Sequence, residues 1–376
     1  MLEILKKLKT KHIILYLIIA LCFAASVVFV NHNESFYKRT VAKVTSIQQQ
    51  GEKKVTDVHN NKDRLFTQNI TAEIRNGKDK EKNIHLTNTY STTGAYDQDY
   101  HVGNELFVTV NKSENQKGTL TGTIKDVKRD KYVLLVGWCF ILILLIVGKR
   151  RGFFSLISLS VNAALMSYAL DLYLNHANVS LLWICSLLVL LFTTISLLLL
   201  NGFNGMTYAA ITATLVGIFL SLLITYLAIK FTGGSGLRYE EMQFLTRPYE
   251  IVFMAGLFVG SLGAVMDVSI TIASSIFGLV EKNPNISLKA LKTSGMDIGK
   301  DVMGTLTNIL FFVYASGSIP AMILYLKNAS SLGFTLSMNL SLEVARALAG
   351  GIGIVLTIPI AVYTSVFFIN RKRKRI

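Results

Sequence analysis

The chain has 376 residues, of which 51% are hydrophobic, and it carries a formal net charge of +15. So apolar a composition, with only four prolines, is not that of a soluble globular protein and predicts an integral membrane protein. The positive charge flanks apolar segments instead of forming one basic face, which argues against a nucleic-acid partner and for a lipid bilayer as the surroundings.

Eight segments come close to the roughly 20 apolar residues that cross the hydrocarbon core of a bilayer. They are expected at residues 12–30, 132–148, 153–174, 180–200, 204–230, 249–279, 302–326 and 342–369. The pattern predicts a polytopic α-helical membrane protein with about eight transmembrane helices. Seven of these segments form one transmembrane domain, residues 132–370.

Four basic clusters lie between or beyond these segments, at residues 6–11, 149–151, 282–300 and 371–375. If the N-terminus is cytoplasmic, eight crossings place all four clusters on the cytoplasmic side, as the positive-inside rule requires. We therefore expect a protein of the cell membrane with both termini in the cytoplasm. Residues 371–376 would form a basic cytoplasmic tail.

The first thirty residues have the basic start and apolar run of a signal peptide. The run ends at Val28-Phe29-Val30 without a small-x-small cleavage site, which favours an uncleaved N-terminal transmembrane helix over residues 1–30. The three cysteines, Cys22, Cys139 and Cys185, all fall within expected membrane helices. No disulfide framework is predicted.

Residues 31–131 are polar and contain short runs in which apolar and polar residues alternate. Strands are expected at residues 41–47, 70–74, 84–86, 106–110 and 120–124. Asn76-Gly77, between the second and third strands, is a hairpin turn signal. Five short strands in about 100 residues suggest a small closed or nearly closed β-barrel, of the OB type, on the extracytoplasmic side.

Two groups of side chains in this domain invite a binding role. His59, His85 and His101 match no metal-ligand spacing, and scattered histidines are usually solvated or structural, so no metal is expected. The aromatic residues could form a stacking surface, although core packing is the simpler interpretation. They are Phe66, Tyr90, Tyr96 and Tyr100.

The segment 249–279 contains a carboxylate, Asp267, near its middle. A charged group at the centre of a bilayer costs several kcal/mol, so it is expected to face protein or water. At helical spacing, one face carries small and hydroxyl side chains on either side of this acid. The members of the face are Gly260, Gly263, Asp267, Thr271 and Ser274, and Gly256 forms a small-xxx-small pair with Gly260.

The last two segments carry similar stripes. The seventh presents Asp301, Thr305 and Asn308 on one face, after Asp297, and the eighth presents Gly350 and Gly353. The glycines Gly256, Gly260, Gly263, Gly350 and Gly353 would let helices approach closely. Glu343 and Arg346, three residues apart near the outer end, can pair with each other.

Together the three stripes could enclose a hydrated path for a proton or cation. It would run from the Glu343/Arg346 pair through Asp267 to Asp297 and Asp301. The alternative is that hydrogen bonds from Thr305 or Asn308 hold Asp267 neutral, and that Asp267 only fixes helix register. For Asp297 and Asp301, a place at a helix N-terminus and its favourable dipole would be a sufficient explanation.

The run GAVMDVSITIASSIFGLVEKNP, followed by SLKALKTSGMDIGKDVMGTLTN and a glycine-rich last helix, resembles the YibE/F family of bacterial multi-pass membrane proteins. The exported segment, with Val102-Gly103-Asn104 before an alternating strand, is similar to that family too, although Gly-Asp is more usual there. A more distant similarity is to the SecD/SecF and RND-type permeases. The resemblance implies an integral protein of the bacterial cell envelope.

Two functions remain open. The first is a secondary transporter or exporter with a relay through Asp267, acting on an unknown substrate or coupling ion. The second is a non-transporting envelope scaffold that binds a partner protein or a second copy of itself. No motif of an intramembrane enzyme is present, so no catalytic residue and no cofactor are expected.

Overall fold

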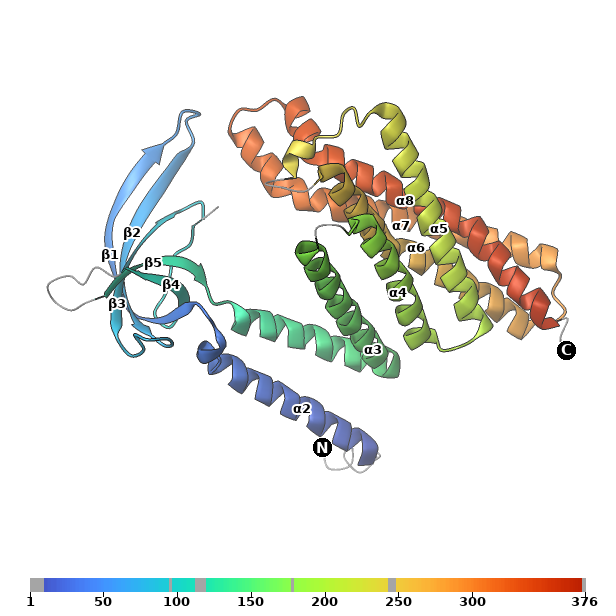
Figure 1. The fold of residues 1–376 in the computed structure, drawn as a ribbon, viewed down its shortest axis with the longest axis horizontal. Coiled ribbons are helices and arrows are strands. Elements are labelled where there is room, and N and C mark those ends of the chain that lie inside the picture. The colour runs from blue at the N-terminus through green and yellow to red at the C-terminus, as the bar shows by residue number, and fades with distance from the viewer. Residues whose placement is uncertain (1–9, 95–96, 112–119, 177–178, 243–247, 374–376) are drawn as a thin grey trace. The chain divides into compact units, whose positions relative to one another are not determined.

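The computed structural model describes residues 10–94, 97–111, 120–176, 179–242 and 248–373 (Figure 1). The chain divides into two compact units, Met1–Val147 and Gly148–Ile376. The first holds a helix, a small sheet and the first half of a second helix. The second consists of the remaining helices.

The sheet of the first unit has five strands. They are β1 (Thr40–Thr56), β2 (Lys62–Ile74), β3 (Asn83–Ser91), β4 (Glu105–Asn111) and β5 (Leu120–Val127). All neighbouring pairs are antiparallel except β3 and β5, which run parallel. Because β4 also pairs with β1, the sheet closes into a barrel with the order β1-β2-β3-β5-β4. All five strands overlap the expected segments, and β1 and β2 extend well beyond them.

The core of the barrel follows the alternation of the strands. Ile70, Ile74, Ile84 and Leu106 are fully buried there, and Tyr100 joins them at 8% exposure, as core packing predicted for that residue. The other aromatic side chains lie elsewhere. Phe66 and Tyr90 are half-buried and stack on each other with ring centroids 5.2 Å apart, and Tyr96 lies outside the described residues.

The Asn-Gly pair between β2 and β3 does more than turn the chain. The connection runs from residue 75 to residue 82, so it is longer than a two-residue hairpin turn. The buried Asn76 side chain accepts a hydrogen bond from the Val41 N–H and donates to three backbone carbonyls in residues 34–39. This amide therefore fixes the chain as it enters β1.

Two helices adjoin the barrel within the first unit: α2 (Thr10–Asn31) and the beginning of α3 (Asp130–Asn175). A short turn, η1 (Glu34–Phe36), leads from α2 towards β1. The Trp138 indole donates to the Ser26 hydroxyl at 2.8 Å, and its ring meets Phe23 edge-on at 5.4 Å. These contacts hold α2 and the first half of α3 together.

The described residues contain six helices that are long and apolar enough to cross a membrane. The sequence predicted about eight spans, and two of those, 132–148 and 153–174, lie in the single helix α3. The helix continues through the basic turn with a kink at Lys149, where φ is 48° and ψ is −124°. The first predicted span corresponds to α2, whose described apolar part is the shorter stretch Leu17–Asn31.

The second unit contains the later half of α3 and five long helices. They are α4 (Leu181–Asn201), α5 (Gly205–Thr232), α6 (Tyr249–Lys282), α7 (Leu288–Lys327) and α8 (Leu332–Arg373), with the short turn η2 (Tyr239–Glu241) before α6. Helix α8 packs against α5, α6 and α7, and Val268, Ile272 and Ile358 lie in their shared core. Helix α8 runs on to Arg373, so residues 371–373 form its last turn. The expected cytoplasmic tail, residues 371–376, stays a prediction.

Candidate functional site: the polar faces of α6 and α7

Helix α6 has one buried side and one open side. The buried side carries large apolar residues, among them Phe258, Val265 and Ile272. On the other side Gly256, Gly260, Gly263, Asp267 and Ser274 are exposed and Thr271 is half-buried. We call these six residues the α6 polar face. Helix α8 packs on the apolar side of α6, through contacts such as Gly353 on Val265, and does not cover this face. The expectation that the face looks onto protein or water stays a prediction.

Asp267 is exposed and has no hydrogen bond or ion pair with any other described residue. The hydrogen bonds from Thr305 or Asn308 that would make it a register device are therefore not formed. The carboxylate also lies within a helix long and apolar enough to span a membrane. A free carboxylate at that depth is costly against lipid, so its surroundings require a polar or hydrated neighbour.

The three predicted packing glycines of α6 differ in their surroundings. A Cβ at Gly260 would meet the hydroxyl of Tyr314 on α7, so this glycine marks the close approach of the two helices. Gly256 and Gly263 have open space, since no atom of the described residues lies within 4 Å of either Cβ position. Their small size is not needed for packing within the chain.

The polar side of α7 turns away from the bundle. Asp297, Asp301, Thr305 and Asn308, the α7 polar face, are all exposed. The opposite side of α7 packs inward, and Gly299 lies there against Ile358 of α8. The chain's own helices thus do not bring the α7 polar face together with Asp267. The path through these residues stays a prediction, since the described residues of one chain show no contact between the two groups.

The N-terminal dipole does not explain the α7 carboxylates. Helix α7 begins at Leu288, and its cap is Ser287, whose hydroxyl accepts from the Ala290 N–H. Asp297 and Asp301 therefore lie beyond the first turn, where the dipole interaction has faded. Asp297 pairs with Lys300 at 3.1 Å, and Asp301 has no polar partner among the described residues.

The eighth helix agrees with its predictions. Gly350 and Gly353 are buried, and Cβ positions there would lie 2.7 Å from Leu310 and 2.9 Å from Val265, respectively. Glu343 and Arg346 form the expected ion pair, and the Arg346 guanidinium lies 5.3 Å from the centre of the Phe253 ring. Both side chains are about one-fifth exposed, which makes this pair part of the packed bundle.

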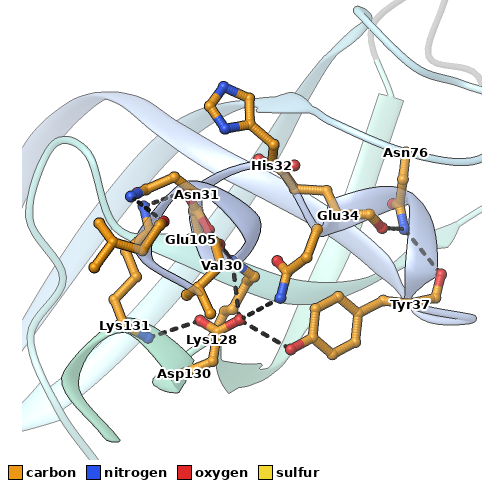
Figure 2. A network of polar contacts seen from close by, with 12 residues as sticks. Val30, Asn31, His32, Glu34, Tyr37, Asn76, Glu105, Lys128, Asp130 and Lys131 are labelled. Atoms are coloured by element: carbon orange, nitrogen blue, oxygen red, sulfur yellow. Dashed lines mark hydrogen bonds and ion pairs between the residues drawn. The ribbon is translucent and has the colours of Figure 1, made fainter. Parts of the chain in front are cut away.

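Sequence reasoning missed a network of charged groups in the first unit, shown in Figure 2. Lys128 is 4% exposed, and its ammonium group lies 2.7 Å from Glu105 and 3.2 Å from Asp130. It also donates to the Val30 carbonyl at 3.1 Å. Lys131 binds the second oxygen of Glu105 at 2.7 Å. The network connects the end of α2, strand β4 and the start of α3, and we call it the neck.

Neutral side chains complete the neck. Asp130 accepts hydrogen bonds from the Asn33 amide at 2.9 Å and from the Tyr37 hydroxyl at 3.0 Å. Each charged group in the neck thus has at least one partner of opposite charge. The only visible signal was the run Lys128-Arg129-Asp130-Lys131 before an apolar helix, which is typical of ordinary charges at a membrane surface.

The electrostatics of the neck favour the charged forms. Burial by itself would raise the pKa of Glu105, but the hydrogen bonds and charges of Lys128 and Lys131 outweigh it and hold that pKa below its ordinary value. Burial would likewise lower the pKa of Lys128, yet Glu105 and Asp130 keep it above its ordinary value. The ion pairs therefore persist across the neutral pH range.

Two family models match the chain. One, described as YibE/F-like protein, matches residues 136–371, and the other, described as the YibE/F family N-terminal domain, matches residues 35–127. Their boundary falls at the neck. No curated protein and no solved structure matches the chain. The similarity to SecD/SecF and RND-type permeases stays a prediction.

Proposed function

The chain belongs to the YibE/F family, and from that premise and its apolar helices we propose that it is a multi-pass secondary transporter or exporter of the bacterial cytoplasmic membrane. In this proposal Asp267 takes up and releases a proton or a cation as the coupling ion moves. The chain acts by transport and not as an enzyme.

The proposed topology has eight crossings. Helix α2, the two halves of α3 on either side of Lys149, and helices α4 to α8 supply them. With both termini in the cytoplasm, the basic residues at the α3 kink, at the α6–α7 connection and at the end of α8 share the cytoplasmic side. The barrel then lies outside, and its strand order with a parallel β3–β5 pair supports the OB type.

The observation that carries the proposal is the free carboxylate of Asp267. A structural acid at such depth would be paired or hydrogen-bonded, as the charged groups of the neck are. Asp267 instead lies open among glycines and hydroxyl groups, with no partner among the described residues. This arrangement suits a group that must bind and release an ion repeatedly.

The α6 polar face needs a cover within the bilayer. Open space lies at Gly263, one turn before Asp267, and at Gly256, further towards the start of α6, and small residues allow another helix to approach closely. We propose that a second copy of this chain provides the cover and encloses the hydrated path. Substitution of a bulky side chain at Gly263 would then impair assembly without disturbing the fold of one chain.

The test is proton flux in proteoliposomes under an imposed pH gradient, with the membrane potential clamped. We expect the parent protein to carry protons and Asp267→Asn to lower the initial rate by about a hundredfold, since a positioned proton-transfer group contributes at least that much. Asp171→Asn removes another exposed carboxylate of a membrane helix, on α3, and is expected to keep the parent rate. Equal flux in Asp267→Asn and the parent would remove the relay.

The neck favours a second candidate function, an envelope scaffold. It joins the barrel to α2 and α3 through buried ion pairs, as a partner-binding domain on a fixed stalk would require. Crosslinking from the exposed barrel surface should then capture one stable envelope protein. Under this function, deletion of residues 31–131 would abolish activity whereas Asp267→Asn would spare it.

A further inference from the structure

A cavity of about 640 Å³ opens at one end of the helical bundle in the second unit. It lies among the start of α5, the end of α6 and the last turn of α8. Its walls include the rings of Tyr208, Phe277 and Phe368, and its charged groups are Glu281, Arg371 and Lys372. None of its lining residues belongs to the α6 polar face or the α7 polar face, so the cavity is a separate feature.

Two cations of the described chain, Arg371 and Lys372, line the cavity, and the helical turn that carries them is anchored. Arg373 donates to the carbonyl of Pro284 at 2.7 Å and to that of Ile286 at 3.1 Å, which fixes the end of α8 to the α6–α7 connection. Arg371 and Lys372 precede it on the same helical turn and are exposed. Among the described residues neither forms a hydrogen bond or an ion pair. Their charges are thus available to an anion.

The location of the cavity at helix ends and its aromatic lining indicate which kind of anion it would bind. Helices α5, α6 and α8 are all candidate membrane spans, so their ends at this cavity lie at the level of lipid headgroups. Basic pockets between helix ends on the cytoplasmic side are suited to acidic lipid headgroups. The aromatic walls would contact the glycerol and upper acyl chains, which free phosphate lacks. Among the described residues that line the cavity, Glu281 is the only acid, and its charge would oppose an anion.

We propose that this cavity binds the phosphate headgroup of an acidic phospholipid, with Arg371 and Lys372 as the residues that recognise it. The site does not depend on ion movement through Asp267. It specifies a lipid for the end of the bundle and gives the last turn of α8 a binding role.

The test is lipid retention by the full-length protein, measured by native mass spectrometry after equilibration with phosphatidylglycerol and phosphatidylcholine. We expect preferential retention of phosphatidylglycerol. Arg371→Gln with Lys372→Gln should weaken it by about 25-fold, since each cation near a membrane surface contributes about fivefold. The matched control, Lys149→Gln with Arg151→Gln, removes the same charges from the exposed α3 turn and should leave retention unchanged.

A second variant keeps the test independent of folding defects. Glu281→Gln removes the opposing carboxylate and should tighten phosphatidylglycerol binding severalfold, a gain that a damaged fold would not produce. The proposal is overturned if both double variants lose the lipid equally, or if phosphatidylcholine is retained as well. It is also overturned if millimolar inorganic phosphate displaces the lipid completely, because the apolar walls would then contribute nothing.

Discussion

Charged side chains are paired in the neck, whereas the carboxylate of the α6 polar face is unpaired among the described residues. In the neck, Glu105, Lys128 and Asp130 are largely removed from solvent, and each lies within 3.2 Å of an opposite charge. On α6, Asp267 is open and unpartnered among the described residues. Complete pairing is what a structural joint needs, whereas a group that exchanges an ion must remain free. The contrast supports an architectural role for the neck and the proposed ion-exchange role for Asp267.

The largest expected effect is a loss of stability when the ion pairs of the neck are removed. Lys128→Met leaves Glu105 and Asp130 buried without their shared cation, and removal of one partner from a buried pair costs about 3 to 5 kcal/mol. Hydrogen exchange of the β1 and β4 amides should show this loss of protection. Lys125→Met, at an exposed residue of β5, is the control and should change stability by less than about 0.5 kcal/mol. Equal effects of the two substitutions would show that the neck is not the joint.

Glycine substitutions sharpen the comparison within the second unit. Gly353→Val places new methyl groups against Val265 and Ser221, and overpacking of this kind costs about 1 to 3 kcal/mol. Gly263→Val enters open space on the α6 polar face and should leave the thermal melting of one chain unchanged. A fall in melting temperature with Gly263→Val comparable to that with Gly353→Val would contradict the open face.

The pH dependence of the first unit should report on the neck. The pKa of Glu105 is lower in the folded protein, so its contribution to stability is present above its ordinary value of 4.5 and is lost as pH falls through the lower folded value. Amide protection of β4 should therefore decline below about pH 4.5 in the parent. In Glu105→Gln this component of the decline should be absent. The same dependence of amide protection on pH in this variant and the parent would contradict the role of Glu105.

The smallest expected effect is a difference in chemical access. In a chain without its three cysteines, Ser274→Cys on the α6 polar face should react faster with a charged, membrane-impermeant thiol reagent than Leu223→Cys on the exposed apolar side of α5. A hydrated path exposes the first thiol to water, whereas lipid shields the second. Equal rates in membrane vesicles would indicate that no water reaches the α6 polar face.

Much of the fold could be predicted from the sequence because its signals are local. Alternating residues marked the strands, long apolar runs marked the helices, and the spacing of Glu343 and Arg346 indicated their pair. Periodicity also showed that Gly350 and Gly353 share a face, and the structure buries that face. The kink at Lys149 was visible only as a basic turn, because a left-handed backbone at one lysine leaves no sequence signal.

The environment of the candidate site could not be predicted in the same way. Helical spacing shows which residues share a face of α6 or α7, but it does not show which face a neighbour covers. Either side of α6 could pack against another helix, one through large apolar residues and the other through glycines. In the structure α8 packs against the apolar side. The neck was missed because Glu105 and Lys128 are far apart in sequence, and only closure of the barrel brings them together.

The most direct test of the account measures proton flux and thermal melting together on Asp267→Asn, reconstituted beside the parent protein. We expect the initial rate of flux to fall about a hundredfold while the melting temperature stays the same, because Asp267 has no partner to lose among the described residues. Parental flux in this variant, or a melting temperature that falls as far as it does in Lys128→Met, would show that Asp267 is a structural group after all.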